Sequence, residues 1–214
     1  MSDPQQVMAA LCARVGVREP EGWRGFLDLA RSWNERTDLT SARSDVELAE
    51  VLFLDAAHLI RAGWIQAEAA LLDVGAGVGA PTIPLVLAVP SLTAVLVEPR
   101  RIRAAFLRTA SGALGIPKRL TVREQRLDTA RPSIPGAPFD VALSRATFAP
   151  ESWLRIGAAL ATEIWVFAAG GKVEGPANLQ LERELRYEVP SSGAPRAIFA
   201  YRRQAPEVGS ETSQ

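Results

Sequence analysis

The sequence has little of the residue types that build disulfides and metal sites. Its 214 residues include one cysteine, Cys12, and one histidine, His58. A lone cysteine excludes an internal disulfide and a thiolate zinc site, and a single histidine argues against a metal centre built on imidazole. We therefore expect a protein that uses no metal and resides in the reducing cytoplasm.

Net charge and long apolar runs are also missing. The 24 basic residues balance 24 acidic ones, so no global positive field gathers nucleic acid, although a local basic patch remains compatible with this balance. No apolar run approaches the roughly 20 residues that span a bilayer, and the N-terminus lacks the charged-then-apolar pattern of a signal peptide. The sequence therefore predicts no membrane association, and we expect a monomer.

The first 68 residues predict a helical cap. Residues 7–15 favour a short helix, and Trp23, Phe26, Leu27, Ala30 and Trp33 then recur at helical spacing. Further on, a serine followed three residues later by a glutamate fits a capping box that opens another helix. The capping pair is Ser44 and Glu47, and the expected inward face of that helix is Val46, Ala49, Leu52, Phe53, Ala56 and Leu59.

Residues 69–203 alternate between strand and helix patterns, which predicts an α/β fold with a doubly wound, mostly parallel sheet. Expected strands are Ala70–Val74, Thr93–Glu98, Leu120–Arg123, Phe139–Ser144 and Ile164–Ala168, with an antiparallel pair at Leu185–Val189 and Ala197–Tyr201. Expected helices are Pro81–Val89, Arg100–Leu114 (inward face Ile102, Ala105, Phe106, Thr109 and Ala113) and Pro150–Ala161. Residues 204–214 are polar and are expected to be disordered. Ligands of such sheets bind at the carboxyl ends of the strands.

A glycine-rich turn follows the first expected strand. Gly75, Gly77 and Gly79 alternate with other residues and lead to Ala80. Glycine tolerates positive φ and lets a ligand approach the backbone closely. The spacing also fits the dinucleotide fingerprint, so the glycines alone leave both NAD and S-adenosylmethionine open.

Two acidic residues at strand ends favour S-adenosylmethionine. Asp73 ends the first expected strand, where it would repel a pyrophosphate but suits the amino group of this methyl donor. Glu98 ends the second expected strand, where it can accept the ribose hydroxyls of either cofactor. The alternative for Asp73 is a structural cap that accepts hydrogen bonds from nearby backbone N–H groups.

Several stretches together resemble the RsmG (GidB) family of methyltransferases. The pattern W-N-x-x-x-N-L-T is matched at residues 33–40, with Asp38 in place of the second asparagine. The pattern D-V-G-x-G-x-G-x-P-x-I-P-L is matched at residues 73–85, and F-D-x-x-x-S-R-A at residues 139–146. The resemblance implies a class I methyltransferase fold, S-adenosylmethionine as cofactor, and methylation of guanine N7 in small-subunit ribosomal RNA.

The resemblance also implies roles for individual residues. Glu98 matches the ribose-binding acid, Leu127 and Asp128 fall in the stretch that lies against the adenine, and Arg145 falls at the methyl-donor site. We expect Arg145 and Asn34 to carry the chemistry, which needs alignment rather than a general base because guanine N7 has a free lone pair. The alternatives are that Arg145 pairs with a surface carboxylate and that Asn34 caps a helix or turn.

Departures from the family pattern leave other functions open. The family's histidine on the second cap helix is Leu52, and the lysine expected after the fifth strand is Gly170, with Lys172 two residues late. A paralogue that methylates another RNA or a small molecule fits these changes, as does a non-catalytic protein that docks on the ribosome.

Aromatic and basic residues supply candidates for RNA contact. Phe148 follows Arg145 and could stack on an extruded base, whereas helical spacing places Trp33 and Phe53 in the core. The arginines of the helix after the second strand are expected to face solvent. These are Arg100, Arg101, Arg103 and Arg108.

Overall fold

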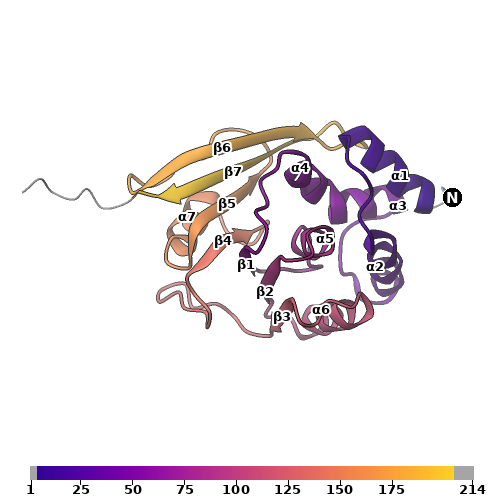
Figure 1. Cartoon of the computed structure of the whole chain (residues 1–214), viewed down its shortest axis with the longest axis horizontal. Helices are drawn as coiled ribbons and strands as arrows, with labels where there is room; N and C mark the ends of the chain where they lie inside the picture. Colours follow the sequence, from indigo (N-terminus) through magenta and orange to yellow (C-terminus); the bar gives the residue numbers. More distant parts are fainter. Residues whose placement is uncertain (1–3, 205–214) are drawn as a thin grey trace, which may run out of the picture.

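One sheet of seven strands runs through residues 4–204, the part of the chain that the computed structural model describes (Figure 1). The strands are β1 (Ala70–Val74), β2 (Thr93–Val97), β3 (Leu120–Arg123), β4 (Phe139–Ser144), β5 (Ala161–Ala168), β6 (Leu179–Glu188) and β7 (Pro195–Arg203). Their order is β3-β2-β1-β4-β5-β7-β6. Strands β1 to β5 are parallel, and β7 runs antiparallel to both of its neighbours. The strand order reverses between β1 and β4, which is where such sheets bind ligands.

Helices cover both faces of the sheet. They are α1 (Pro4–Val15), α2 (Trp23–Thr37), α3 (Asp45–Ala49), the π-helical segment η1 (Glu50–Leu54), α4 (Asp55–Arg61), α5 (Thr82–Ala88), α6 (Arg101–Ala113) and α7 (Pro150–Gly157). In Figure 1, α1 to α6 gather on one side of the strands and α7 lies on the other. The cap helices therefore share a layer with the first two crossover helices.

Alternation along the strands divides the interior into two apolar clusters. Leu71 of β1 and Leu143 of β4 point into the cluster that contains the cap helices, whereas Leu72 and Ala142 point into the cluster under α7. Successive side chains of a strand face opposite sides of a sheet, so both faces of these central strands are buried. The predicted boundary between residues 1–68 and 69–203 crosses the first cluster. One direct link is the Trp23 Nε1–H group, which donates to the carbonyl oxygen of Pro84 in α5 at 3.0 Å.

The predicted fold class is confirmed, and most of its elements lie where the sequence placed them. Strands β1, β3 and β4 have the predicted bounds, while β5 begins at Ala161 instead of Ile164 and α7 ends at Gly157. The closing hairpin is longer than predicted, because β6 begins at Leu179. The first half of β6 has only Leu179 and Leu181 as apolar residues, and Leu181 is 41% exposed, so this short alternation does not by itself mark a strand. Of the predicted disordered tail, residues 205–214 lie outside the described residues.

Two predicted helix faces need correction. Val46 is 37% exposed at the start of α3, and Ile102 is 57% exposed on α6, although both were expected to face inward. Thr109 and Ala113 of α6 are also exposed. The buried face of α6 is rotated and consists of Ala104, Phe106, Leu107, Ala110 and Ser111. Alanines at neighbouring positions fit two adjacent faces equally well, so the contact with α2 decides which one is buried.

The predicted capping box forms with one difference. Ser44 Oγ accepts a hydrogen bond from the Glu47 N–H group at 3.2 Å, as expected, but Glu47 Oε2 accepts from the N–H group of Arg43, at 2.7 Å. The helix start is thereby satisfied from both sides. Within residues 4–204 no helix has the length and apolarity needed to cross a membrane.

Candidate active site

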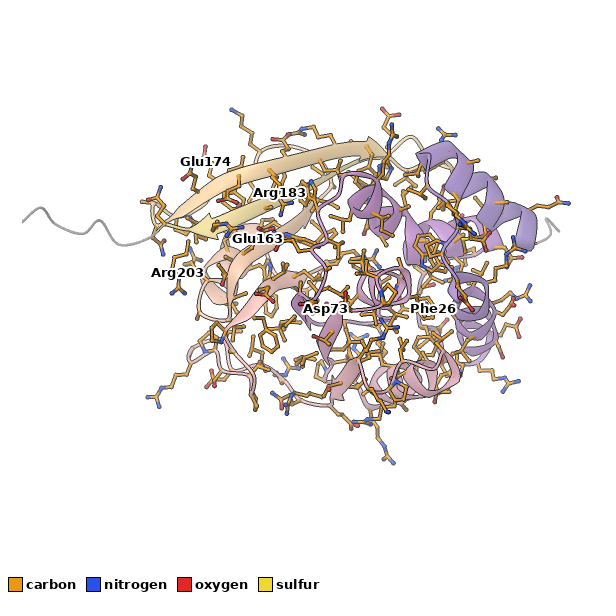
Figure 2. The ribbon with its side chains drawn as sticks, in the orientation of Figure 1. Phe26, Asp73, Glu163, Glu174, Arg183 and Arg203 are labelled. Atoms are coloured by element: carbon orange, nitrogen blue, oxygen red, sulfur yellow. The ribbon has the colours of Figure 1, made fainter. Side chains whose placement is uncertain are left out.

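Asp73 is a buried carboxylate at the carboxyl end of β1. Its side chain is 1% exposed, and Figure 2 shows it in the interior of the molecule. Its Oδ2 accepts a hydrogen bond from the hydroxyl of Thr82, the first residue of α5, at 2.7 Å. Burial raises the pKa of Asp73 from 3.8 to about 7, against the lowering effects of the Thr82 hydrogen bond and the Arg145 charge. An acid in this setting is poised to gain a cationic partner.

Most backbone N–H groups of the glycine turn donate to a hydrogen-bond acceptor in the protein. The N–H groups of Gly75 and Ala76 donate to the carbonyl oxygen of Val97, and that of Gly79 donates to Ala76. All three glycines have positive φ. A Cβ on Gly75 would lie 2.2 Å from the Thr147 hydroxyl, whereas a Cβ on Gly77 would meet nothing closer than 3.8 Å. Gly77 is therefore the point of the turn that a ligand can approach closely.

Glu98 joins the glycine turn to the start of α6. Its Oε2 accepts from the Gly77 N–H group at 2.9 Å, and its Oε1 accepts from the Arg100 N–H group at 2.8 Å. Its side chain is 3% exposed. A carboxylate has about four lone-pair sites, so these two bonds leave acceptor capacity for ribose hydroxyls. Asp73 lies near the end of β1 and Glu98 follows the paired strand β2, which places both acids at one edge of the sheet.

Arg145 is held against the cap. Its Nη1 donates to Asp55 Oδ2 at 2.8 Å and to the carbonyl oxygen of Val51 at 2.9 Å. The sequence offered an ion pair with a surface carboxylate as the alternative role of Arg145. An ion pair does form, but its carboxylate belongs to the cap and is only 10% exposed. The charge of Arg145, which follows β4 beside β1, lowers the pKa of Asp73.

Leu127 and Asp128 occupy the loop after β3. Leu127 is buried in the cluster that contains Val74 and Val97, and so lies under the ends of β1 and β2. Asp128 is exposed, and its Oδ1 accepts from the N–H groups of Ala130 and Arg131. The assigned contact of these two residues with the adenine stays a prediction.

Asn34 adopts the capping alternative. Its Oδ1 accepts from the Thr40 N–H group at 2.8 Å, and its amide donates to the carbonyl oxygen of Ala42, so it fastens the loop after α2. These contacts give no support to the predicted catalytic role. Phe148 is half-buried and stacks on Trp153 with ring centroids 5.7 Å apart, so one face of its ring is covered and its contact with a base stays a prediction.

The aromatic residues of the cap lie in the core as predicted, but one arginine of α6 lies beside the glycine turn. Phe53 is fully buried and stacks on Trp23, and Trp33 packs edge-on against Phe106, as the helical spacing indicated. Arg108 of α6 pairs with Glu124. Arg103 differs from the expected solvent-facing set, because its guanidinium lies beside Gly77.

Two functional candidates were not singled out by the sequence. Thr82 is identified by its bond to Asp73, and Tyr187 of β6 by its hydroxyl bond to Asp55 Oδ1. Thr82 lies inside the glycine-loop pattern and could have been noted there. Tyr187 is 132 positions away from its partner, and no local pattern marks such a residue.

The residues present fit S-adenosylmethionine. A buried acid suits its amino group, a second acid with free acceptor capacity suits its ribose, and the Gly77 backbone beside that second acid leaves room for close approach. Within residues 4–204 there is no group of three or more His, Cys, Asp and Glu side chains that could hold a metal ion.

Comparisons with known proteins identify the family of this chain. Residues 21–171 match the family model GidB, described as rRNA small subunit methyltransferase G. A curated relative with that name from Myxococcus xanthus is 32% identical over 90% of this chain and 95% of its own, and one from Anaeromyxobacter dehalogenans is 29% identical over 93% and 97%.

Solved structures share the fold at low sequence identity. A SAM-dependent methyltransferase from Thiobacillus denitrificans, in complex with S-adenosyl-L-homocysteine, superposes with a TM-score of 0.58 over 81% of this chain and 98% of its own, at 9% identity. A putative methyltransferase from Escherichia coli has a TM-score of 0.55 over 69% and 83%, at 20% identity. The fold is that of class I S-adenosylmethionine-dependent methyltransferases, and the chain belongs to the GidB family of small-subunit ribosomal RNA methyltransferases.

Proposed function

We propose that this protein transfers a methyl group from S-adenosylmethionine to N7 of a guanine in small-subunit ribosomal RNA. The observation that carries the proposal is the pair of buried acids, Asp73 and Glu98, at the ends of neighbouring strands in a chain of this family. We further propose that it acts as a monomer in the cytoplasm and needs no metal.

The division of labour follows from the contacts. When bound, S-adenosylmethionine supplies an electrophilic methyl group on a positively charged sulfur. Asp73 holds the amino group by charge, and Glu98 orients the ribose while it fixes the glycine turn. Asp128, in the loop after β3, and buried Leu127 border the adenine. These residues bring the donor to one edge of the sheet, and alignment of N7 with the methyl carbon completes the reaction.

The leucine at position 52, where the family pattern has a histidine, does not favour a different methyl acceptor. Leu52 is 1% exposed and packs in the main apolar cluster, so its change from histidine alters the core rather than the polar lining of the site. The paralogue with a small-molecule acceptor therefore has less support than the ribosomal RNA methyltransferase.

The decisive experiment is methylation of native subunits. The purified protein is incubated with labelled S-adenosylmethionine and small ribosomal subunits that lack N7-methylguanine, and the RNA is then cleaved chemically at N7-methylguanine. We expect one strong cleavage site. Label without N7 cleavage would overturn the position, and label only in small molecules would overturn the RNA acceptor. Calorimetry with S-adenosylmethionine and with NAD tests the cofactor separately. The affinity of Asp73→Asn for S-adenosylmethionine is compared with that of Asp140→Asn. This control alters an acid on the neighbouring strand whose carboxylate accepts from the Ala70 N–H group.

A further inference from the structure

A pocket of about 510 Å³ lies beside the donor site. Three parts of the fold line it: the cap from Ser41 to Asp55, the end of β5 with the residues that follow β4 and β5, and the β6–β7 hairpin. Because β1 and β4 are paired, with Asp73 opposite Leu143, the pocket lies on the β4 side of the switch point, and the two acids lie on the other. A pocket in this place can hold a second reactant next to the donor.

Arg145 enters this pocket as part of a network from three elements. Its Nη1 binds Asp55 Oδ2, and the Tyr187 hydroxyl of β6 donates to Asp55 Oδ1. The Tyr187 ring stacks on His58, with centroids 4.0 Å apart and an interplanar angle of 16°. Both carboxylate oxygens of Asp55 are thus engaged, and the plane of the carboxylate is fixed by a partner on each side.

The hairpin that carries Tyr187 is fastened to the cap at a second point. Glu50, 7% exposed, accepts from the Ser191 N–H group at 2.7 Å and also from the Ser191 hydroxyl. The turn between β6 and β7 is therefore held against the π-helical segment, and Tyr187 is held with it. Burial raises the pKa of Tyr187, and the charge of Asp55 raises it further, so the phenol stays a neutral donor.

We propose that this pocket receives the acceptor guanine, that Arg145 contacts the base, and that Asp55 and Tyr187 are positioning residues for Arg145. This inference rests on the proposed function. Among the described residues, the Nε and Nη2 groups of Arg145 have no hydrogen-bond partner, so they remain donors. Guanine presents O6 and N7 as acceptors, and a donor on O6 identifies the base while N7 stays free for the methyl group.

The ion pair also suits the movement of charge. Methyl transfer to N7 leaves a positive charge on the base, and an isolated guanidinium in contact with it would oppose that charge. Asp55 lies 2.8 Å from Arg145 and offsets its charge, so the arginine can donate to O6 at a smaller electrostatic penalty. Tyr187 keeps Asp55 in the orientation that makes this pair.

The chain offers a matched pair of substitutions, because its two tyrosines both lie in the hairpin and both donate a hydroxyl bond. Tyr187→Phe removes the bond to Asp55 and keeps the ring on His58, whereas Tyr201→Phe removes a bond to the carbonyl oxygen of Val173 in the other apolar cluster. We expect Tyr187→Phe to lower kcat for N7 methylation roughly tenfold or more. KM for the subunits, affinity for S-adenosylmethionine and Tm are expected to stay within the range set by Tyr201→Phe.

A purely structural role gives a different result. If Tyr187 only fastens the hairpin, Tyr187→Phe lowers Tm and leaves kcat of the folded enzyme unchanged, which would overturn the proposal. A loss of affinity for S-adenosylmethionine as large as the loss of kcat would also overturn the proposal. If the wild-type protein methylates no guanine N7, the proposed function fails first and this inference falls with it. An active wild-type enzyme with an unaffected Tyr187→Phe variant refutes the inference alone.

A double-mutant cycle tests whether Tyr187 acts through Asp55. Asp55→Asn keeps the side-chain volume and removes the charge that pairs with Arg145. We expect its loss of kcat to exceed that of Tyr187→Phe, and we expect the double variant to be no slower than Asp55→Asn alone. Losses that multiply in the double variant would show that Tyr187 acts independently of Asp55, and the positioning role would be wrong.

Discussion

The buried carboxyl group of Asp73 makes a measurable prediction about stability. The folded protein keeps this proton up to about pH 7, whereas the unfolded chain loses it near pH 3.8. Between these values the unfolded state binds fewer protons, so the group's contribution to stability falls as the pH rises. Asp73→Asn retains an oxygen for the Thr82 hydroxyl and does not titrate, so it removes this pH dependence.

The size of the effect follows from the two pKa values. Between pH 5 and pH 8 the wild-type protein is expected to lose about 2.5 kcal/mol of unfolding free energy relative to Asp73→Asn. The comparison cancels the titrating groups that do not interact with Asp73, including His58, whose pKa is lowered by burial.

Urea denaturation without methyl donor measures this difference. Unfolding free energies of the wild-type protein and Asp73→Asn are compared at pH 5 and pH 8, with Asp140→Asn as the control for a change of one charge. A difference between wild type and Asp73→Asn that is the same at both pH values would refute the raised pKa. It would also refute the inference that burial disfavours the ionised form of Asp73 and that a cationic ligand offsets this cost.

Three further outcomes follow from the same contacts. Affinity for S-adenosylmethionine should be about fivefold higher at pH 7 than at pH 6, because the cation binds ionised Asp73, and calorimetry at the two pH values checks this. Gly75→Ala should lower the free energy of unfolding by about 2 kcal/mol or more, because the new Cβ would lie 2.2 Å from Thr147 and the φ of this residue is 77°. Gly77→Ala should lower it by only about 1 kcal/mol, because this position has space for a Cβ and only its φ of 56° is unfavourable. Thermal unfolding of the two variants measures this difference. Ser44→Ala should cost about 1 kcal/mol in urea denaturation through loss of the helix cap, and an unchanged midpoint would contradict that role.

Sequence patterns placed the predicted donor-binding residues at one edge of the sheet because these residues are close along the chain. Asp73 and the three glycines form one strand–turn unit, and Glu98 ends the next strand, so the alternation of strand and helix was enough to place them at one edge. The capping box of Ser44 succeeded for the same reason, since both partners lie within one turn. Their roles in binding the donor remain predictions that the experiments above test.

Patterns failed where the deciding contact is distant or where two local choices are equivalent. The buried face of α6 was misassigned because alanines around Phe106 occupy adjacent faces, and packing against the cap decides between them. For Asn34 the sequence left a catalytic and a capping role open; the structure shows the capping contacts, and the catalytic role stays a prediction. The contact of Phe148 with Trp153, five positions on, was not predicted either, because it depends on how the start of α7 packs.

The acceptor half of the site is built from contacts that no local pattern contains. Arg145 meets Asp55 across 90 positions and Tyr187 meets Asp55 across 132, while Glu50 meets Ser191 across 141. All three contacts end on the cap between Glu50 and Asp55, so the short π-helical segment and the residue after it hold both the end of β4 and the closing hairpin. We expect a substitution there to alter the proposed acceptor pocket and to leave Asp73 and Glu98 in place, because the hydrogen bonds of these two acids are made to Thr82, Gly77 and Arg100.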